Sequence, residues 1–85
     1  MSFNLYKISQ DKNQDWNTYV SAVVCAEDEQ QARHIHPDSN MTGEWWVDED
    51  NYGDWVKPDD VKVALIGITD LIPPGEVICS NNTGA

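Results

Sequence analysis

The sequence has few basic residues and lacks the short motifs that identify common enzymes. Only 5 lysines and arginines stand against 15 aspartates and glutamates, which gives a formal net charge of −10 at pH 7. So strong a negative charge repels nucleic acids and anionic lipid surfaces, so neither is expected as a direct partner. The chain has no glycine-rich phosphate loop, nucleophile elbow or paired-carboxylate motif. We therefore expect a protein without catalytic activity or cofactor, whose partner is a basic protein.

Long apolar runs and cysteines are also scarce. No segment approaches the roughly 20 apolar residues that a membrane span needs. The N-terminus has no basic stretch followed by an apolar run, which a secretory signal would show, so we expect a cytoplasmic protein. Because that compartment is reducing, Cys25 and Cys79 are expected to remain thiols, and a disulfide between them is the less favoured alternative.

What the sequence does contain is a set of strand patterns around one short helix. Runs rich in β-branched and apolar residues predict strands at about 3–8, 18–26, 61–69 and 76–80, with the third strand buried. A helix is predicted over about 27–36, because acids lead this segment, Arg33 and His34 stand near its end, and Pro37 stops it. The order ββαββ predicts one α+β domain spanning 1–85, with a four-stranded, mostly antiparallel sheet and the helix on one face.

The segment 38–60 combines tryptophans with acids and shows no clear period. It contains Trp45, Trp46 and Trp55, and its single base is Lys57. Its acids include Glu44, Asp48, Glu49, Asp50, Asp54, Asp59 and Asp60. Tryptophan often dominates interface energy, and acids steer a basic partner from long range. We predict that the three tryptophans anchor such a partner and that Asp48, Glu49, Asp50 and Asp54 steer it. The alternative is that the tryptophans complete a thin core and the acids only solvate it.

Part of the same segment also allows a short hairpin, formed by 44–47 and 52–56, across the acids between them. Its acids suggest a second, weaker possibility, a calcium site. Asp48, Asp50 and Asp59 fall at positions one, three and twelve of an EF-hand-like loop. The match is partial, because no helices are expected to flank this loop.

Two further sites would use the end of the predicted helix. Arg33, His34 and His36 could hold a small anionic, nucleotide-like ligand against a tryptophan, with loops completed across a homo-oligomer. The two histidines could instead join Cys25 and Cys79 in a zinc site, although no CxxC or HxxxH spacing brings these residues together. The simpler interpretation is that His34 is a cation at the helix C-terminus and that the cysteines pack in the core.

Three stretches of the chain together form one recognisable pattern: 19–37 (YVSAVVCAEDEQQARHIHP), 55–68 (WVKPDDVKVALIGI) and 74–85 (PGEVICSNNTGA). This pattern, SAVVxAxxExxARxIHP followed by WVxPxxVxVxLIG and PGxVI, resembles that of a group of short phage and bacterial proteins. The resemblance covers most of the chain outside 38–54 and brings no established activity with it. Together with the small size and acidity, it suggests a phage-type inhibitor that docks on a basic host protein, either a defence factor or a nucleic-acid-handling factor.

Overall fold

A computed structural model describes residues 2–12, 18–38, 44–47 and 55–82. Its elements are β1 (Phe3–Ser9), β2 (Tyr19–Ala26), α1 (Glu29–Arg33), η1 (Trp45–Val47), η3 (Pro58–Asp60), β3 (Lys62–Thr69) and β4 (Val77–Asn82). The four strands and the helix lie where the sequence predicted them. The hairpin prediction is wrong at 44–47, because these residues enter a 3-10 helix; most of the other predicted strand lies outside the described residues.

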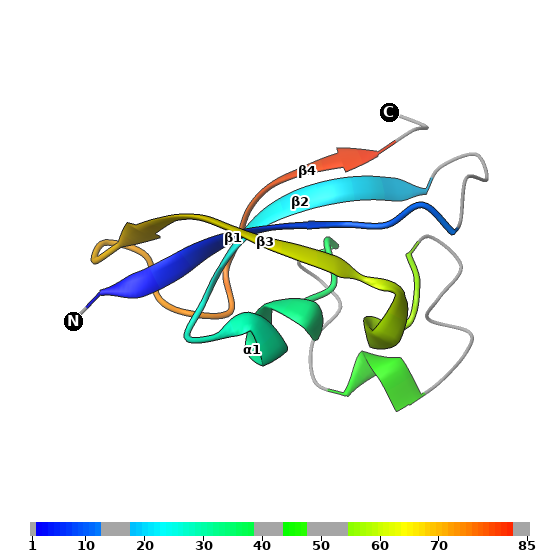
Figure 1. Ribbon diagram of the computed structural model, residues 1–85, viewed down its shortest axis with the longest axis horizontal. Coiled ribbons are helices and arrows are strands. Elements are labelled where there is room, and N and C mark those ends of the chain that lie inside the picture. The colour runs from blue at the N-terminus through cyan, green and yellow to red at the C-terminus, as the bar shows by residue number, and fades with distance from the viewer. Residues whose placement is uncertain (1, 13–17, 39–43, 48–54, 83–85) are drawn as a thin grey trace.

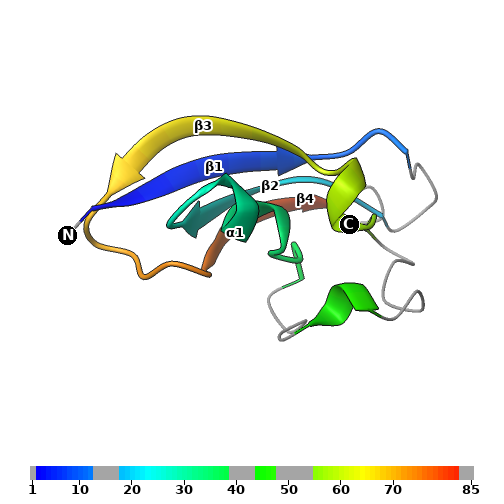
Figure 2. The ribbon, with the colours of Figure 1, turned by 60° about the horizontal axis from the view of Figure 1, so that its bottom comes forward.

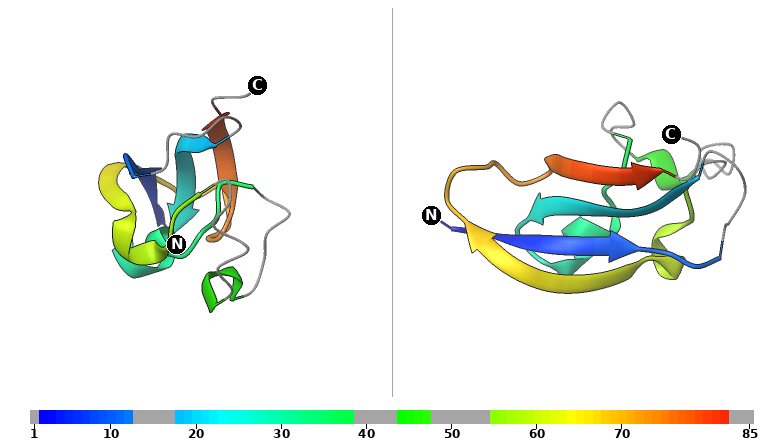
Figure 3. Two further views of the ribbon diagram at one scale, coloured as in Figure 1. Left: turned by 90° about the vertical axis from the view of Figure 1, so that its right-hand side faces the viewer. Right: turned by 90° about the horizontal axis from the view of Figure 1, so that it is seen from above.

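All four strands form one antiparallel sheet in the order β3-β1-β2-β4 (Figure 1). Seen from above, β1 and β2 occupy the centre and β3 and β4 the two edges (Figure 3). The predicted α+β fold is therefore confirmed: a four-stranded antiparallel sheet with one short helix. The prediction of a buried third strand is wrong, because β3 lies at an edge and several of its side chains are exposed.

Helix α1 has only 5 residues, fewer than the predicted 27–36. Asp28 is its N-cap, with a side chain that accepts a hydrogen bond of 2.8 Å from the backbone N–H of Gln31. The Gln31 side chain in turn accepts from the N–H of Glu27 at 2.6 Å, so these acids lead into the helix instead of extending it. A helix this short is not stable alone, and the burial of Ala32 against the sheet supports it.

The described helices all cover the same side of the sheet, and the core lies between them and the strands (Figures 1 and 2). The buried hydrophobic cluster comprises Tyr6, Ile8, Ala22, Val24, Ala26, Ala32, Trp45, Trp55, Val56 and Val61. Alternation along the central strands places Tyr6 and Ile8 of β1 beside Val24 and Ala22 of β2 on this side. None of the helices in the described ranges is long and apolar enough to cross a membrane.

Candidate functional site: the tryptophan–histidine cluster

Five rings meet where the chain after α1 packs against η1: His34, His36, Trp45, Trp46 and Trp55, here called the tryptophan–histidine cluster. The imidazole of His34 meets the edge of Trp46 at 4.6 Å between ring centroids, and Trp46 is 5.9 Å from Trp45. Trp45 lies 5.0 Å from His36, which lies 6.5 Å from Trp55. The first three pairs are close to perpendicular, the edge-to-face geometry that aromatic rings favour. The cluster is a continuous series of rings that joins the two tryptophan-bearing segments to the end of α1.

One hydrogen bond fixes η1 against the helix. The indole Nε1 of Trp45 donates to the backbone carbonyl of His34 at 2.8 Å. His34 is the C-cap of α1, so this contact satisfies one of the carbonyl groups that a helix leaves unpaired at its end. Trp45 thereby holds η1 in place through both its buried ring and its polar edge.

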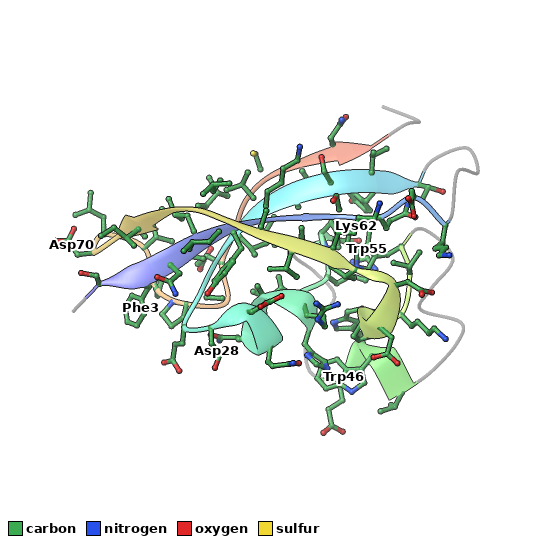
Figure 4. The ribbon with its side chains drawn as sticks, viewed as in Figure 1. Phe3, Asp28, Trp46, Trp55, Lys62 and Asp70 are labelled. Atoms are coloured by element: carbon green, nitrogen blue, oxygen red, sulfur yellow. The ribbon has the colours of Figure 1, made fainter. Side chains whose placement is uncertain are left out.

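The three tryptophans differ in burial. Trp45 is 3% exposed and Trp55 is 1% exposed, so both belong to the core. Trp46 is half-buried, and its neighbour Val47 is 72% exposed. Figure 4 shows Trp46 on the side of the molecule away from the sheet, with Trp55 nearer the strands. A partner could reach Trp45 or Trp55 only if the cluster opened, so Trp46 alone of the three predicted anchors is accessible at the surface.

The exposed part of η1 and the residue before it form what we call the η1 surface: Glu44, Trp46 and Val47. Glu44 is exposed and begins the same turn, in which its backbone carbonyl accepts a hydrogen bond of 3.2 Å from the N–H of Val47. The four acids predicted to steer a partner, Asp48, Glu49, Asp50 and Asp54, lie outside the described residues.

His36 is buried inside the cluster. Its Nδ1 accepts a hydrogen bond of 2.9 Å from the backbone N–H of Asp38, so this nitrogen carries no proton. Tyr19 contacts the same ring edge-on at 6.1 Å between centroids. His36 is therefore enclosed by aromatic rings and serves the core.

Arg33 ties α1 to η3. Its guanidinium donates to the carbonyls of Pro58 at 3.1 Å and Val61 at 2.5 Å, and it also lies 3.5 Å from the carboxylate of Glu29. His34 instead contacts the carbonyl of Gln30 at 2.7 Å through Nδ1. The three residues predicted to bind an anionic ligand thus face different neighbours: Arg33 contacts η3, His34 contacts η1 and His36 points into the core.

Within the described ranges, no group of three or more histidine, cysteine, aspartate or glutamate side chains lies close enough together to hold a metal ion. Asp48 and Asp50 of the predicted calcium loop lie outside these ranges, and Asp59 is exposed on η3. Cys25 and Cys79 are free thiols, the first buried and the second exposed. Burial raises the pKa of the Cys25 thiol, and the nearby carboxylate of Glu76 adds to this shift.

A second exposed apolar region was missed by the sequence analysis. Leu65, Ile66 and Ile68 on β3 and Leu71 just beyond it are 55–89% exposed. An uninterrupted apolar run predicts a strand but does not distinguish an edge strand from a buried central one, because both use the same residue types. The only sequence signals for an edge were the charges that flank the run, Lys62 and Asp70.

No family model matches the chain, and no curated protein and no solved structure matches it. The resemblance of 19–37, 55–68 and 74–85 to phage and bacterial proteins therefore stays a prediction, and the function is inferred from the residues of the chain itself.

Proposed function

We propose that this protein is a non-catalytic, cytoplasmic binding protein whose η1 surface docks on a basic protein. In line with its small size, its acidity and the resemblance of its sequence to phage proteins, the partner would be a host defence or nucleic-acid-handling factor that it inhibits. The observation that carries this proposal is the pairing of adjacent tryptophans, with Trp45 buried in the core and Trp46 at the surface beside an exposed Val47.

The η1 surface is held in place before any partner binds. The buried ring of Trp45 and its hydrogen bond to the His34 carbonyl hold η1 in position. The ring of Trp46 also packs edge-on against His34 at 4.6 Å. Binding at this surface would therefore immobilise little that is not already ordered, which lowers the entropic cost of association.

The negative charge of the chain favours a basic partner. A net charge of −10 creates a field that attracts a basic surface and raises the rate of association. Glu44 is an exposed acid in the same turn as Trp46 and Val47, which matches the usual anatomy of an aromatic anchor with a polar rim. The affinity should fall as salt rises, because surface charges are screened beyond about 8–10 Å at physiological ionic strength.

The test starts from immobilised protein and a lysate of host cells at low salt, eluted along a salt gradient and analysed by mass spectrometry. A captured basic protein is then purified and titrated by calorimetry against the wild type, Trp46→Ala and Val47→Ala. We expect Trp46→Ala to weaken binding about tenfold or more. Leu71→Ala is the matched control, because Leu71 is 89% exposed but lies beyond β3 and not on the η1 surface. The proposal fails if no basic protein is captured, or if its affinity responds neither to salt nor to Trp46→Ala.

A further inference from the structure

We propose that the outer edge of β3 is a self-association surface, on which a second copy of this chain pairs its own β3 antiparallel to form a continuous eight-stranded sheet. This inference is independent of docking through the η1 surface, because it rests on different residues on a different part of the fold.

The first observation is the open edge of β3. The strand pairs with β1 on one side, and in Figure 3 no described segment runs beside its other side in the plane of the sheet. The backbone N–H and C=O groups on such an edge are a template for another strand. Natural edges are commonly protected by charge, proline or a β-bulge; the seven residues 63–69 contain no charge and no proline, and the one such device is the bulge at Ile66.

The second observation is the exposure of large apolar side chains on this strand. Leu65 is 62% exposed, Ile66 is 55% exposed and Ile68 is 68% exposed. Small proteins rarely leave several large aliphatic residues exposed side by side unless a partner covers them. Strand addition would cover both these side chains and the unpaired backbone.

The third observation identifies the occupant as a second copy. Lys62 and Asp70 are the only charged residues in 62–70, and they stand at opposite ends of β3 (Figure 4). When two copies of this strand pair antiparallel, each lysine approaches the partner's aspartate, whereas parallel pairing would bring like charges together. The edge is therefore complementary to itself in the antiparallel orientation, as a two-fold dimer requires.

Strand β3 has a bulge at Ile66, because Leu65 lies opposite Tyr6 and Gly67 lies opposite Leu5. This bulge indicates the register in which two copies of β3 would pair. Val63 lies opposite Ile8 and Ile68 opposite Asn4, both on the helix-covered side of the sheet, whereas Ala64 and Gly67 lie on the open side. With a two-fold axis between residues 65 and 66, side chains on the helix-covered side of one copy lie opposite side chains on the same side of the other copy. This axis sets Val63 opposite the partner's Ile68, Ala64 opposite the partner's Gly67 and Lys62 opposite the partner's Thr69. The long side chain of Lys62 then lies one residue from the partner's Asp70, within its reach but not directly opposite.

The first test is sedimentation velocity of the full chain from micromolar to millimolar concentration. We expect a monomer–dimer equilibrium that Ile68→Lys weakens about tenfold or more, because the new charge would be buried at the edge. Val47→Lys is the matched control, since it also replaces a β-branched residue by lysine, at a site outside β3 of similar exposure, 72% against 68%. A monomer at every concentration, or equal effects of the two lysines, overturns the proposal.

A charge exchange tests the identity and orientation of the partner strand. Lys62→Asp and Asp70→Lys should each weaken the dimer roughly three- to tenfold, and the double variant should restore it. Lys62 also forms an ion pair of 2.7 Å with Asp11 within one chain. The double exchange does not rebuild that ion pair, so recovery would report the contact between copies. A double variant as weak as the single variants would rule out antiparallel self-pairing, provided circular dichroism shows that all are folded.

The two proposals fail separately. Trp46→Ala should weaken docking on the basic partner and leave the dimer constant unchanged, whereas Ile68→Lys should weaken the dimer and leave docking unchanged. If instead a foreign β-strand peptide binds this edge while the chain alone stays monomeric, a second copy is not the occupant.

Discussion

Trp45 and Trp46 are adjacent in the sequence and have opposite surroundings. Truncation of the buried ring, Trp45→Ala, should lower the free energy of unfolding by about 3–5 kcal/mol, because it leaves a cavity in the core and removes the hydrogen bond to His34. Trp46→Ala should cost about 1 kcal/mol, since its ring is already half in water. Denaturant unfolding followed by circular dichroism measures both values. Equal losses for the two variants would contradict the assignment of one ring to the core and the other to the surface.

The two cysteines offer a chemical test of burial. Cys25 is buried and its thiol donates to the carbonyl of Ile72 at 3.3 Å, whereas Cys79 is exposed. Because burial raises the pKa of Cys25, the reactive thiolate is disfavoured there. We expect iodoacetamide to label Cys79 at least about a hundredfold faster than Cys25 in the folded protein. Peptide mass spectrometry, with labelling in denaturant as the control, compares the two rates.

The raised pKa of Cys25 should make the stability of the fold depend on pH. The unfolded chain releases the Cys25 proton near the ordinary thiol pKa of about 8.5, before the folded chain does. The folded state then holds more protons, so the free energy of unfolding should fall as pH rises above this value. Cys25→Ala should remove this part of the slope, and Cys79→Ala serves as its control. An unchanged slope in Cys25→Ala would contradict the raised pKa.

At the residue scale, the sequence predicted which residue types matter better than it predicted where they lie. It identified the tryptophans of 38–60 as either anchors or core, and the structure buries Trp45 and Trp55 and leaves Trp46 half-buried. That division depends on the 3-10 turn at η1, which directs two adjacent side chains into different surroundings. No hydrophobic period marks such a short turn, because three residues are too few for a burial pattern to repeat.

At the scale of the elements, Arg33 joins α1 to η3 through hydrogen bonds that a single substitution can remove. Arg33→Met should lower the free energy of unfolding by about 1–3 kcal/mol, because the carbonyl of buried Val61 loses this donor, whereas the Pro58 carbonyl keeps its bond from the Val61 N–H at 3.1 Å. Lys57→Met removes the same charge from an exposed position and should change the stability by less than about 0.5 kcal/mol. If Arg33→Met were as mild as this control, the guanidinium would be free for the anionic ligand that the sequence suggested.

The strands were more predictable than the helix or the edges of the sheet. Runs such as VSAVVCA in β2 have high β-propensity and little competing helical pattern, so their limits were right to within two residues. The helix was predicted too long because Glu27 and Asp28 precede it, one as a hydrogen-bond donor and one as the cap. The edge position of β3 follows from long-range pairing with β1, which local sequence does not encode.

At the scale of the whole molecule, the excess of acid is the dominant physical property. A net charge of −10 on 85 residues destabilises the compact state through self-repulsion, which dissolved salt screens. Sodium chloride should therefore raise the midpoint of thermal unfolding by a few degrees, measured at a protein concentration where the chain is monomeric. The same salt should weaken docking on a basic partner, so stability and affinity would respond with opposite sign.

A charge-reduced variant tests whether self-repulsion is the cause. Glu27 and Glu76 are both exposed, and Glu27→Gln with Glu76→Gln changes the net charge from −10 to −8. This variant should unfold at a higher temperature than the wild type at low salt and gain less from added salt, because less repulsion remains to be screened. Sodium sulfate at equal ionic strength separates screening from anion-specific effects, since sulfate also strengthens apolar burial. If the variant and the wild type gained equally from sodium chloride, self-repulsion between these acids would not be what limits the stability of the folded chain.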